Sequence, residues 1–105
     1  MALQPTSSSG AILSGYGNVP VGNTAVKLLS ANVNRQEFRL INYSTSPDAF
    51  WGTDSSVTTT TGFPIFSGSE QDSSRGMGSM WLGDVWAISS GSPGSADIRV
   101  LEICR

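Results

Sequence analysis

The residue types that most often carry catalysis or bind metals are nearly missing from this 105-residue chain. It contains no histidine and a single cysteine, Cys104. Ser-His-Asp and Cys-His arrangements need a histidine as the base, so the sequence excludes both. It also excludes zinc sites built from histidine or from several cysteines. We therefore predict no metal site, no cofactor and no enzymatic activity.

The eight acidic residues form no paired motif of the kind used in acid-base catalysis. Glu70 and Asp72 can point the same way from an extended segment and hold a cation weakly, but we favour a solvated surface loop. The stretch Asp54-Ser55-Ser56 resembles the start of a calcium-binding loop, yet the regular acidic spacing and the closing glutamate are missing. Cys104 is expected to be a small buried apolar residue.

The aromatic side chains are the one group suited to recognising a ligand. Trp51, Trp81 and Trp86 can stack on sugar rings, because aromatic faces present apolar area at low entropic cost. A domain this small also needs large side chains for its core, and we favour core or subunit contact for all three. A glycan platform requires at least two of them exposed on one face. Trp81 and Trp86 are an odd number of positions apart, so in one unbroken strand they face opposite sides.

Charge and hydropathy argue against two kinds of partner. The formal net charge is −2, and the six basic residues are scattered with no two adjacent, so we predict no nucleic-acid binding. No apolar run approaches the roughly 18 residues of a membrane span. Residues 1–10 lack the basic and apolar regions of a secretory signal. We therefore expect a protein made in the cytoplasm that has no membrane contact.

Short runs of apolar and aromatic residues, bounded by glycine, asparagine, aspartate, proline and serine, predict β-strands along most of the chain. No window supports a helix, because glycine or proline interrupts nearly every one. The fold class is therefore all-β: a small antiparallel β-sandwich, jelly-roll-like, or a small barrel. The predicted strands cover residues 25–29, 37–43, 49–53, 80–82, 84–89 and 98–104.

Three features of the chain predict contacts outside the core. Residues 1–18, rich in serine and glycine, are predicted to form an N-terminal arm that precedes a β-sandwich domain at 19–105. Residues 53–78 are predicted to form a long surface loop. In the last strand, Ile98 and Val100 share one face, and Leu101 and Ile103 share the other. Either a bulge lies near Val100–Leu101, or both faces are covered, one by the core and one by another subunit, which we favour.

Several segments also carry a family resemblance when they are taken in order along the chain. They are NRQEFRLIN at 34–42, AFWGTDSSVT at 49–58, GFPI at 62–65, VWAIS at 85–89 and ADIRVLE at 96–102. Together they resemble small virion proteins of tailed bacteriophages, of the capsid decoration (cement) or head-fibre type, over roughly residues 19–104. The resemblance implies a β-sandwich without catalytic residues, made in the host cytoplasm and located in the virion. The implied partner is the major capsid protein, whose shell it binds and stabilises.

Oligomerisation follows from the small size of the domain. A thin core without a disulfide gains stability by burying surface in a closed symmetric assembly, and we predict a homotrimer. The residues predicted to make inter-subunit or capsid contacts are Ile12, Leu13, Tyr16, Phe63, Ile65, Phe66, Leu101 and Ile103. The alternative is a glycan-binding or adhesion module of a phage tail or fibre, in which Trp51, Trp81 and Trp86 stack on the glycan.

Overall fold

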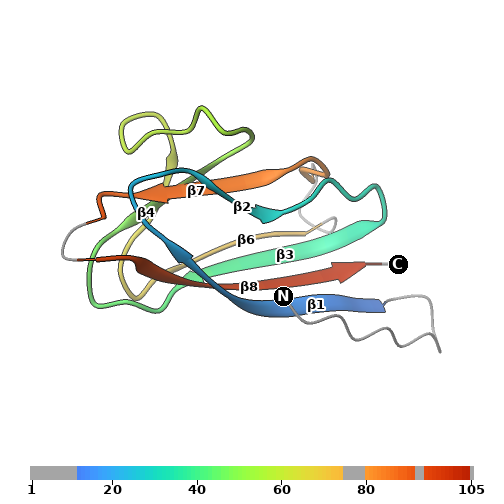
Figure 1. Cartoon of the computed structure of the whole chain (residues 1–105). Coiled ribbons are helices and arrows are strands. Elements are labelled where there is room, and N and C mark those ends of the chain that lie inside the picture. The colour runs from blue at the N-terminus through green and yellow to red at the C-terminus, as the bar shows by residue number, and fades with distance from the viewer. Residues whose placement is uncertain (1–11, 75–79, 92–93, 105) are drawn as a thin grey trace.

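The computed structural model describes residues 12–74, 80–91 and 94–104, with the backbone alone for residues 12–14 and 73–74. These residues form two four-stranded antiparallel sheets packed face to face (Figure 1). Sheet A has the order β1-β8-β3-β6 and sheet B the order β2-β7-β4-β5. The strands are β1 (Ile12–Val21), β2 (Val26–Leu29), β3 (Arg35–Asn42), β4 (Ala49–Gly52), β5 (Phe63–Ile65), β6 (Glu70–Ser74), β7 (Val85–Ser89) and β8 (Ala96–Cys104).

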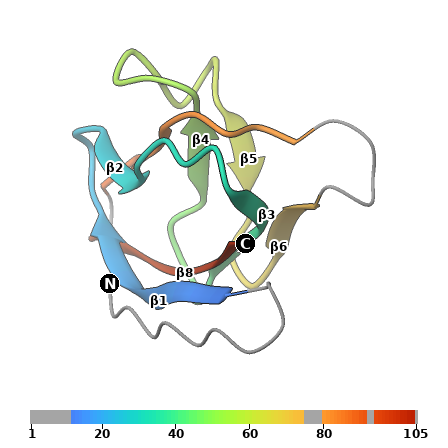
Figure 2. The ribbon, with the colours of Figure 1, turned by 90° about the vertical axis from the view of Figure 1, so that its right-hand side faces the viewer.

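The strand order is that of a jelly roll, a double sheet of eight strands built from two Greek keys. The chain crosses between the sheets at almost every connection, and the last strand, β8, lies beside the first. Figure 2 shows the two layers from the end of the sandwich, with β1 and β8 on one side and β4 and β5 on the other. The prediction of a small β-sandwich is confirmed.

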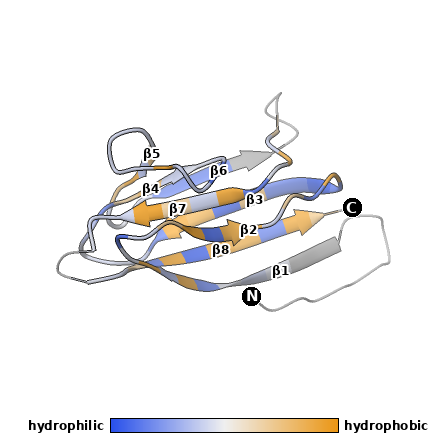
Figure 3. Ribbon diagram, turned by 45° about the horizontal axis from the view of Figure 1, so that its top comes forward, coloured by the Kyte–Doolittle hydropathy of each residue, from blue (hydrophilic) through white to orange (hydrophobic). Residues whose placement is uncertain are grey.

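Alternation of buried and outward-facing residues explains why these segments form strands. In β3, Phe38, Leu40 and Asn42 are buried, whereas Arg39 is exposed and Ile41 is half-buried. Figure 3 shows the same alternation of hydropathy along β8. The buried hydrophobic cluster between the sheets comprises Val21, Leu28, Leu29, Phe38, Leu40, Ala49, Ile65, Val85, Ala87, Ala96, Ile98 and Val100.

Strand β8 alternates without interruption, which resolves part of the ambiguity in the last strand. Ile98 and Val100 face the core, whereas Leu101 and Ile103 are half-buried on the outer side. The register irregularities of sheet A lie in the neighbouring strands, at Leu13/Gly15 in β1 and Arg35/Glu37 in β3. A bulge at Val100–Leu101 is therefore wrong. Cover of the outer face by another subunit stays a prediction.

The boundary predicted for the N-terminal arm is corrected by β1. This strand begins at Ile12 and pairs with β8 from Ile12↔Cys104 to Val21↔Ala96, so residues 12–18 belong to sheet A. Residues 1–11 of the predicted arm lie outside the described residues. The sequence did not predict this strand because Gly15 and Gly17 lower its intrinsic strand propensity. Pairing with the long strand β8 stabilises it instead.

The prediction of one long loop at residues 53–78 is wrong in part, because β5 and β6 lie within it. β6 pairs with β3 from Glu37↔Ser74 to Ile41↔Glu70, although its sequence, EQDSS, has no apolar residue. The turn between β5 and β6 requires Gly68, whose φ of +76° favours glycine, and Ser69 N donates to Phe66 O across it. Residues 80–82, predicted as a strand, have no strand structure.

Candidate functional site

The outward-facing side of sheet A, which we call the outer face, carries large apolar side chains in register. Tyr16 of β1 lies opposite Leu101 of β8, and Leu101 lies opposite Arg39 of β3. In the next row, Arg99 lies opposite Ile41. Tyr16 is exposed, while Leu101 and Ile41 are half-buried. Tyr16, Leu101 and Ile41 thus form an apolar strip across three adjacent strands, with Arg39 and Arg99 beside it.

Tyr43 extends this strip at the end of β3. It is 68% exposed, and the Arg99 guanidinium lies 4.4 Å from the centre of its ring, within cation–π distance. Arg99 also forms an ion pair with Asp97 (2.9 Å), and this hydrogen bond holds the pKa of the Asp97 carboxyl below its usual value. Asp97 is therefore ionised at neutral pH. The contact fixes the Arg99 side chain flat against the face.

Acidic residues outnumber basic ones on the outer face. Arg39 contacts Glu37 at 2.6 Å and Glu70 at 3.5 Å, and Asp72 lies opposite Arg39 in β6. The described outer face thus holds four carboxylates, Glu37, Glu70, Asp72 and Asp97, against two guanidinium groups, Arg39 and Arg99. Its formal charge is −2, so a surface with an apolar centre and a basic rim complements it.

The structure brings together some of the residues predicted to make contacts. Tyr16 and Leu101 are direct cross-strand neighbours, and Ile103 lies opposite Leu13 in the backbone register. The side chains of Ile12 and Leu13 lie outside the described residues. These two strands therefore unite residues that are some 85 positions apart in sequence, such as Tyr16 and Leu101.

The other predicted contact residues lie on sheet B. Phe63 and Phe66 are 62% and 55% exposed, at and just after the edge strand β5. Ile65 between them is wrong as a contact residue, because it is completely buried. Ile65 lies opposite Ala49, a buried residue of β4, and its side chain belongs to the hydrophobic cluster between the sheets.

The three tryptophans do not share a face. Trp51 packs against the core, with its ring edge-on to Phe38 at 5.7 Å. Trp86 lies opposite Gly52 in the next β4 position and so occupies the other side of sheet B. Trp81 is exposed in the loop before β7, and its indole Nε1 donates to Asp84 O at 2.7 Å. A platform made of two exposed tryptophans is not formed.

The loop between β4 and β5, residues 53–62, projects beyond the two sheets (Figure 1). Val57 is buried in it, beside Gly52 and Gly62. Thr58 Oγ1 accepts from Thr60 N and Thr61 N, which closes a tight turn. The run of four threonines, Thr58–Thr61, thus forms a compact turn held by its hydroxyl groups.

Gly62→Ala is expected to lower the free energy of unfolding by about 1–3 kcal/mol, the usual effect of overpacking. A Cβ at this position would lie 2.7 Å from Phe50 Cβ and 2.8 Å from Val57 Cγ2. Gly94→Ala is the matched control, because a Cβ there has nothing within 4 Å. Urea unfolding of the two variants measures the difference, and equal stability of the two would contradict the tight packing of the loop.

A shallow pocket lies between this loop and the end of β4. Its volume is about 210 Å³, and its lining residues are Trp51, Gly52, Thr53, Asp54, Ser56, Val57, Thr61 and Phe63. The rings of Trp51 and Phe63 are 5.4 Å apart. Trp51 Nε1 is buried and is the one such side-chain atom without a hydrogen-bond partner among the described residues. An unsatisfied buried donor costs about 1–3 kcal/mol, which a ligand or water oxygen can offset.

The Asp54 carboxyl in the pocket wall is organised by its own turn. Its Oδ1 accepts from Ser56 N (2.9 Å) and from the Ser56 hydroxyl. These hydrogen bonds hold the pKa of Asp54 below its usual value, so the group is an anionic acceptor at neutral pH. The stretch that resembled a calcium loop is thus a hydrogen-bonded turn.

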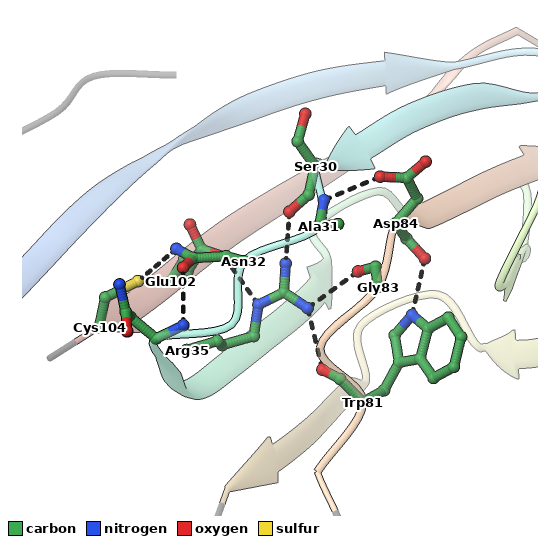
Figure 4. Close-up of polar contacts among 10 residues, drawn as sticks. Ser30, Ala31, Asn32, Arg35, Trp81, Gly83, Asp84, Glu102 and Cys104 are labelled. Atoms are coloured by element: carbon green, nitrogen blue, oxygen red, sulfur yellow. Dashed lines mark hydrogen bonds and ion pairs between the residues drawn. The ribbon is translucent and has the colours of Figure 1, made fainter.

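A buried ion pair at one end of the sandwich was not predicted from the sequence. Arg35, the first residue of β3, is completely buried and donates from Nε to Glu102 Oε2 at 2.7 Å (Figure 4). Its other nitrogens donate to backbone oxygens of Trp81, Gly83 and Ser30 at 2.8–3.1 Å. Arg35 therefore links β3 and β8 to two loops, the one that follows β2 and the one that precedes β7.

The same end of the molecule holds Cys104. The Asn32 amide donates to Cys104 Sγ at 2.8 Å, and Asn32 N donates to Leu82 O at 2.7 Å. The prediction of a buried cysteine is confirmed. One feature of the sequence points to the buried ion pair. Glu102 stands at an inward position of a strand whose other inward residues are apolar, and a buried carboxylate requires a partner.

Other candidate chemistry is limited by geometry. In the part of the chain that the structure describes, no three His, Cys, Asp or Glu side chains converge to hold a metal ion. Glu70 and Asp72 do point the same way, because they are two positions apart in β6, but both lie close to Arg39. Within the described ranges there is also no helix long and apolar enough to cross a membrane.

Comparison with known proteins adds no relative to this picture. The chain matches no protein-family model, no curated protein and no solved structure.

Proposed function

We propose that this protein is a structural virion protein of a tailed bacteriophage, a capsid decoration protein that binds the major capsid shell as a homotrimer and stabilises it. The observation that carries the proposal is the outer face of sheet A. Tyr16, Leu101 and Ile41 present apolar area there from three adjacent strands, and Tyr43 adds to it just after β3. Aromatic side chains and arginines set among apolar residues are typical of protein–protein contact surfaces.

The edge strands of both sheets have features that discourage pairing with another chain, so association through a sheet face is favoured. β1 carries Pro20 and an irregularity beside Gly15, and β5 carries Pro64 at its centre. β6 carries Glu70 and Asp72, and β2 is a short strand with an irregularity of its own. Short length, proline, bulges and charge all discourage one strand from adding to another. The partner is therefore expected to bind the flat outer face of sheet A.

The architecture is compatible with this role. Jelly-roll sandwiches occur in viral capsid domains, although a fold by itself does not establish a function. The charge of the outer face indicates the chemistry of the partner: an apolar centre that contacts Tyr16 and Leu101, with basic groups around it that meet the four carboxylates.

Leu101→Lys is expected to weaken capsid binding by at least about 30-fold, the effect of removing a central contact residue. Lysine places a charge in the middle of the apolar strip, against the expected apolar centre of the partner surface. Ile88→Lys is the matched control, because Ile88 is also half-buried on a central strand but lies on the outside of sheet B. Cosedimentation with capsids that lack this protein measures binding, and circular dichroism checks the fold.

Two results would contradict the proposal. One is equal capsid binding by the two lysine variants, which would remove the outer face of sheet A from the contact. The other is a monomer in sedimentation equilibrium at micromolar concentration that also fails to bind capsids. The alternative of a glycan platform built from Trp51, Trp81 and Trp86 is not favoured, because Trp51 and Trp86 lie on opposite sides of sheet B and both are half-buried.

A further inference from the structure

The pocket beside the β4–β5 loop combines two aromatic rings with several hydroxyl groups and a carboxylate. Trp51 and Phe63 form its apolar side, with ring planes inclined by 36°. Thr53, Asp54, Ser56 and Thr61 supply the polar side. A ligand that fits must therefore present an apolar face to the rings and hydrogen-bonding groups to the opposite wall.

We propose that this pocket binds a single pyranose sugar ring, a role separate from capsid binding. The axial C–H bonds of a pyranose form an apolar face that packs on an aromatic ring, and the hydroxyl groups at its rim donate and accept hydrogen bonds. The volume of about 210 Å³ is below the roughly 300 Å³ at which pockets for drug-sized ligands begin, so one ring fits and a longer segment must extend into solvent.

The groups that would bind the sugar hydroxyls are available. Asp54 uses Oδ1 for its turn, and no hydrogen bond from a described residue reaches its Oδ2. An ionised carboxylate oxygen is a strong acceptor for a hydroxyl group. The hydroxyl-bearing residues Thr53, Ser56 and Thr61 line the same pocket.

The wall of the pocket is ordered before any ligand arrives. Val57 packs into the space left by Gly52 and Gly62, and the Thr58 and Thr61 hydroxyl groups lie 2.9 Å apart in the turn. A preorganised site loses little conformational entropy on binding, which raises affinity for a small ligand. Phe63 is largely exposed in the absence of a ligand, so it has surface to bury when one binds.

The test is a titration of the ¹⁵N-labelled protein with methyl β-D-glucopyranoside, followed by NMR at the indole N–H signals. Each of the three tryptophans gives one signal, assigned with single Trp→Phe variants. We expect the Trp51 signal to shift and saturate with a Kd on the order of 1–10 mM, while the Trp86 signal, on the other side of sheet B, stays in place. Sorbitol, which has hydroxyl groups but no ring, is expected to leave the Trp51 signal unchanged.

Two variants with one matched control locate the site. Phe63→Ala is expected to weaken binding about tenfold by removing one aromatic face, whereas Phe66→Ala, an equally exposed phenylalanine outside the pocket, changes nothing. Asp54→Asn keeps the turn acceptor but loses the anionic oxygen, and about a tenfold loss is again expected. Unchanged Trp81 and Trp86 signals verify folding of each variant.

Three outcomes would overturn the proposal. The first is a Trp51 signal that does not move up to about 50 mM glucopyranoside. The second is an equal shift with sorbitol, which would exclude recognition of the ring. The third is equal weakening by Phe63→Ala and Phe66→Ala, which would place binding elsewhere. Because Leu101 lies on the opposite sheet, Leu101→Lys is expected to leave the titration unchanged, so this test is independent of the capsid proposal.

Discussion

Arg35→Met is expected to lower the free energy of unfolding by about 3–5 kcal/mol, the range found when one partner of a buried ion pair is removed. Arg35 is completely buried, and its guanidinium contacts Glu102 and the backbone oxygens of Trp81, Gly83 and Ser30. Methionine fills similar volume but leaves the Glu102 carboxylate in the interior without its cation. The three backbone oxygens also lose a donor. Urea unfolding followed by circular dichroism measures the loss.

The double variant Arg35→Met/Glu102→Leu separates charge from packing. Removing both charges is expected to recover part of the lost stability, because no unpaired charge remains in the interior. The recovery is expected to be incomplete, since the carbonyl groups that Arg35 binds still lack a donor. Arg39→Met is the matched control: Arg39 also pairs with a glutamate but is exposed, and we expect no measurable change. A loss below about 1 kcal/mol for Arg35→Met would contradict the structural role of the buried pair.

Ile65→Ala is expected to lower the free energy of unfolding by about 2–5 kcal/mol, the range found when a buried isoleucine is truncated. Ile65 is completely buried in the cluster between the sheets and lies opposite Ala49. Its removal leaves a cavity next to a small residue that cannot fill it. Thermal or urea unfolding of the isolated chain measures the effect.

The neighbouring residue provides the control for this prediction. Phe66→Ala removes a larger side chain one position away, but Phe66 is mostly exposed, so we expect a change within about 0.5 kcal/mol. Comparing the two variants shows whether the Ile65 side chain is part of the core or part of a subunit contact. If Ile65 made a contact with another subunit, as its neighbours suggested, Ile65→Ala would leave the monomer as stable as Phe66→Ala does.

The fold class and most of the strands could be predicted from the sequence because they depend on local alternation. Residues 37–43 alternate apolar and polar side chains over a full strand, and the structure buries Phe38, Leu40 and Asn42. β6 could not be predicted, because its five polar residues are ordered by pairing with β3 and not by burial of their own. The same holds for the part of β1 around Gly15 and Gly17.

The candidate sites depended more on tertiary structure. Tyr16 and Leu101 were singled out separately as apolar contacts, and only the β1–β8 pairing places them side by side. Trp51 was predicted to make core or subunit contact, with a glycan platform as the alternative, and only the structure places its ring beside Phe63 in a pocket that residues 53–62 complete. A turn of this kind depends on hydroxyl-to-backbone hydrogen bonds and on glycines beside Val57, which have no hydropathy signal.

The sequence alone excluded histidine-dependent chemistry and determined an all-β fold class, because residue counts and period-two alternation are local properties. Tertiary structure decided the jelly-roll strand order, the burial of Ile65 and Arg35, and the composition of the outer face. The physical reason is that these features depend on pairings between residues far apart in the chain. Arg35 and Glu102, 67 positions apart, become partners only when β3 and β8 lie side by side.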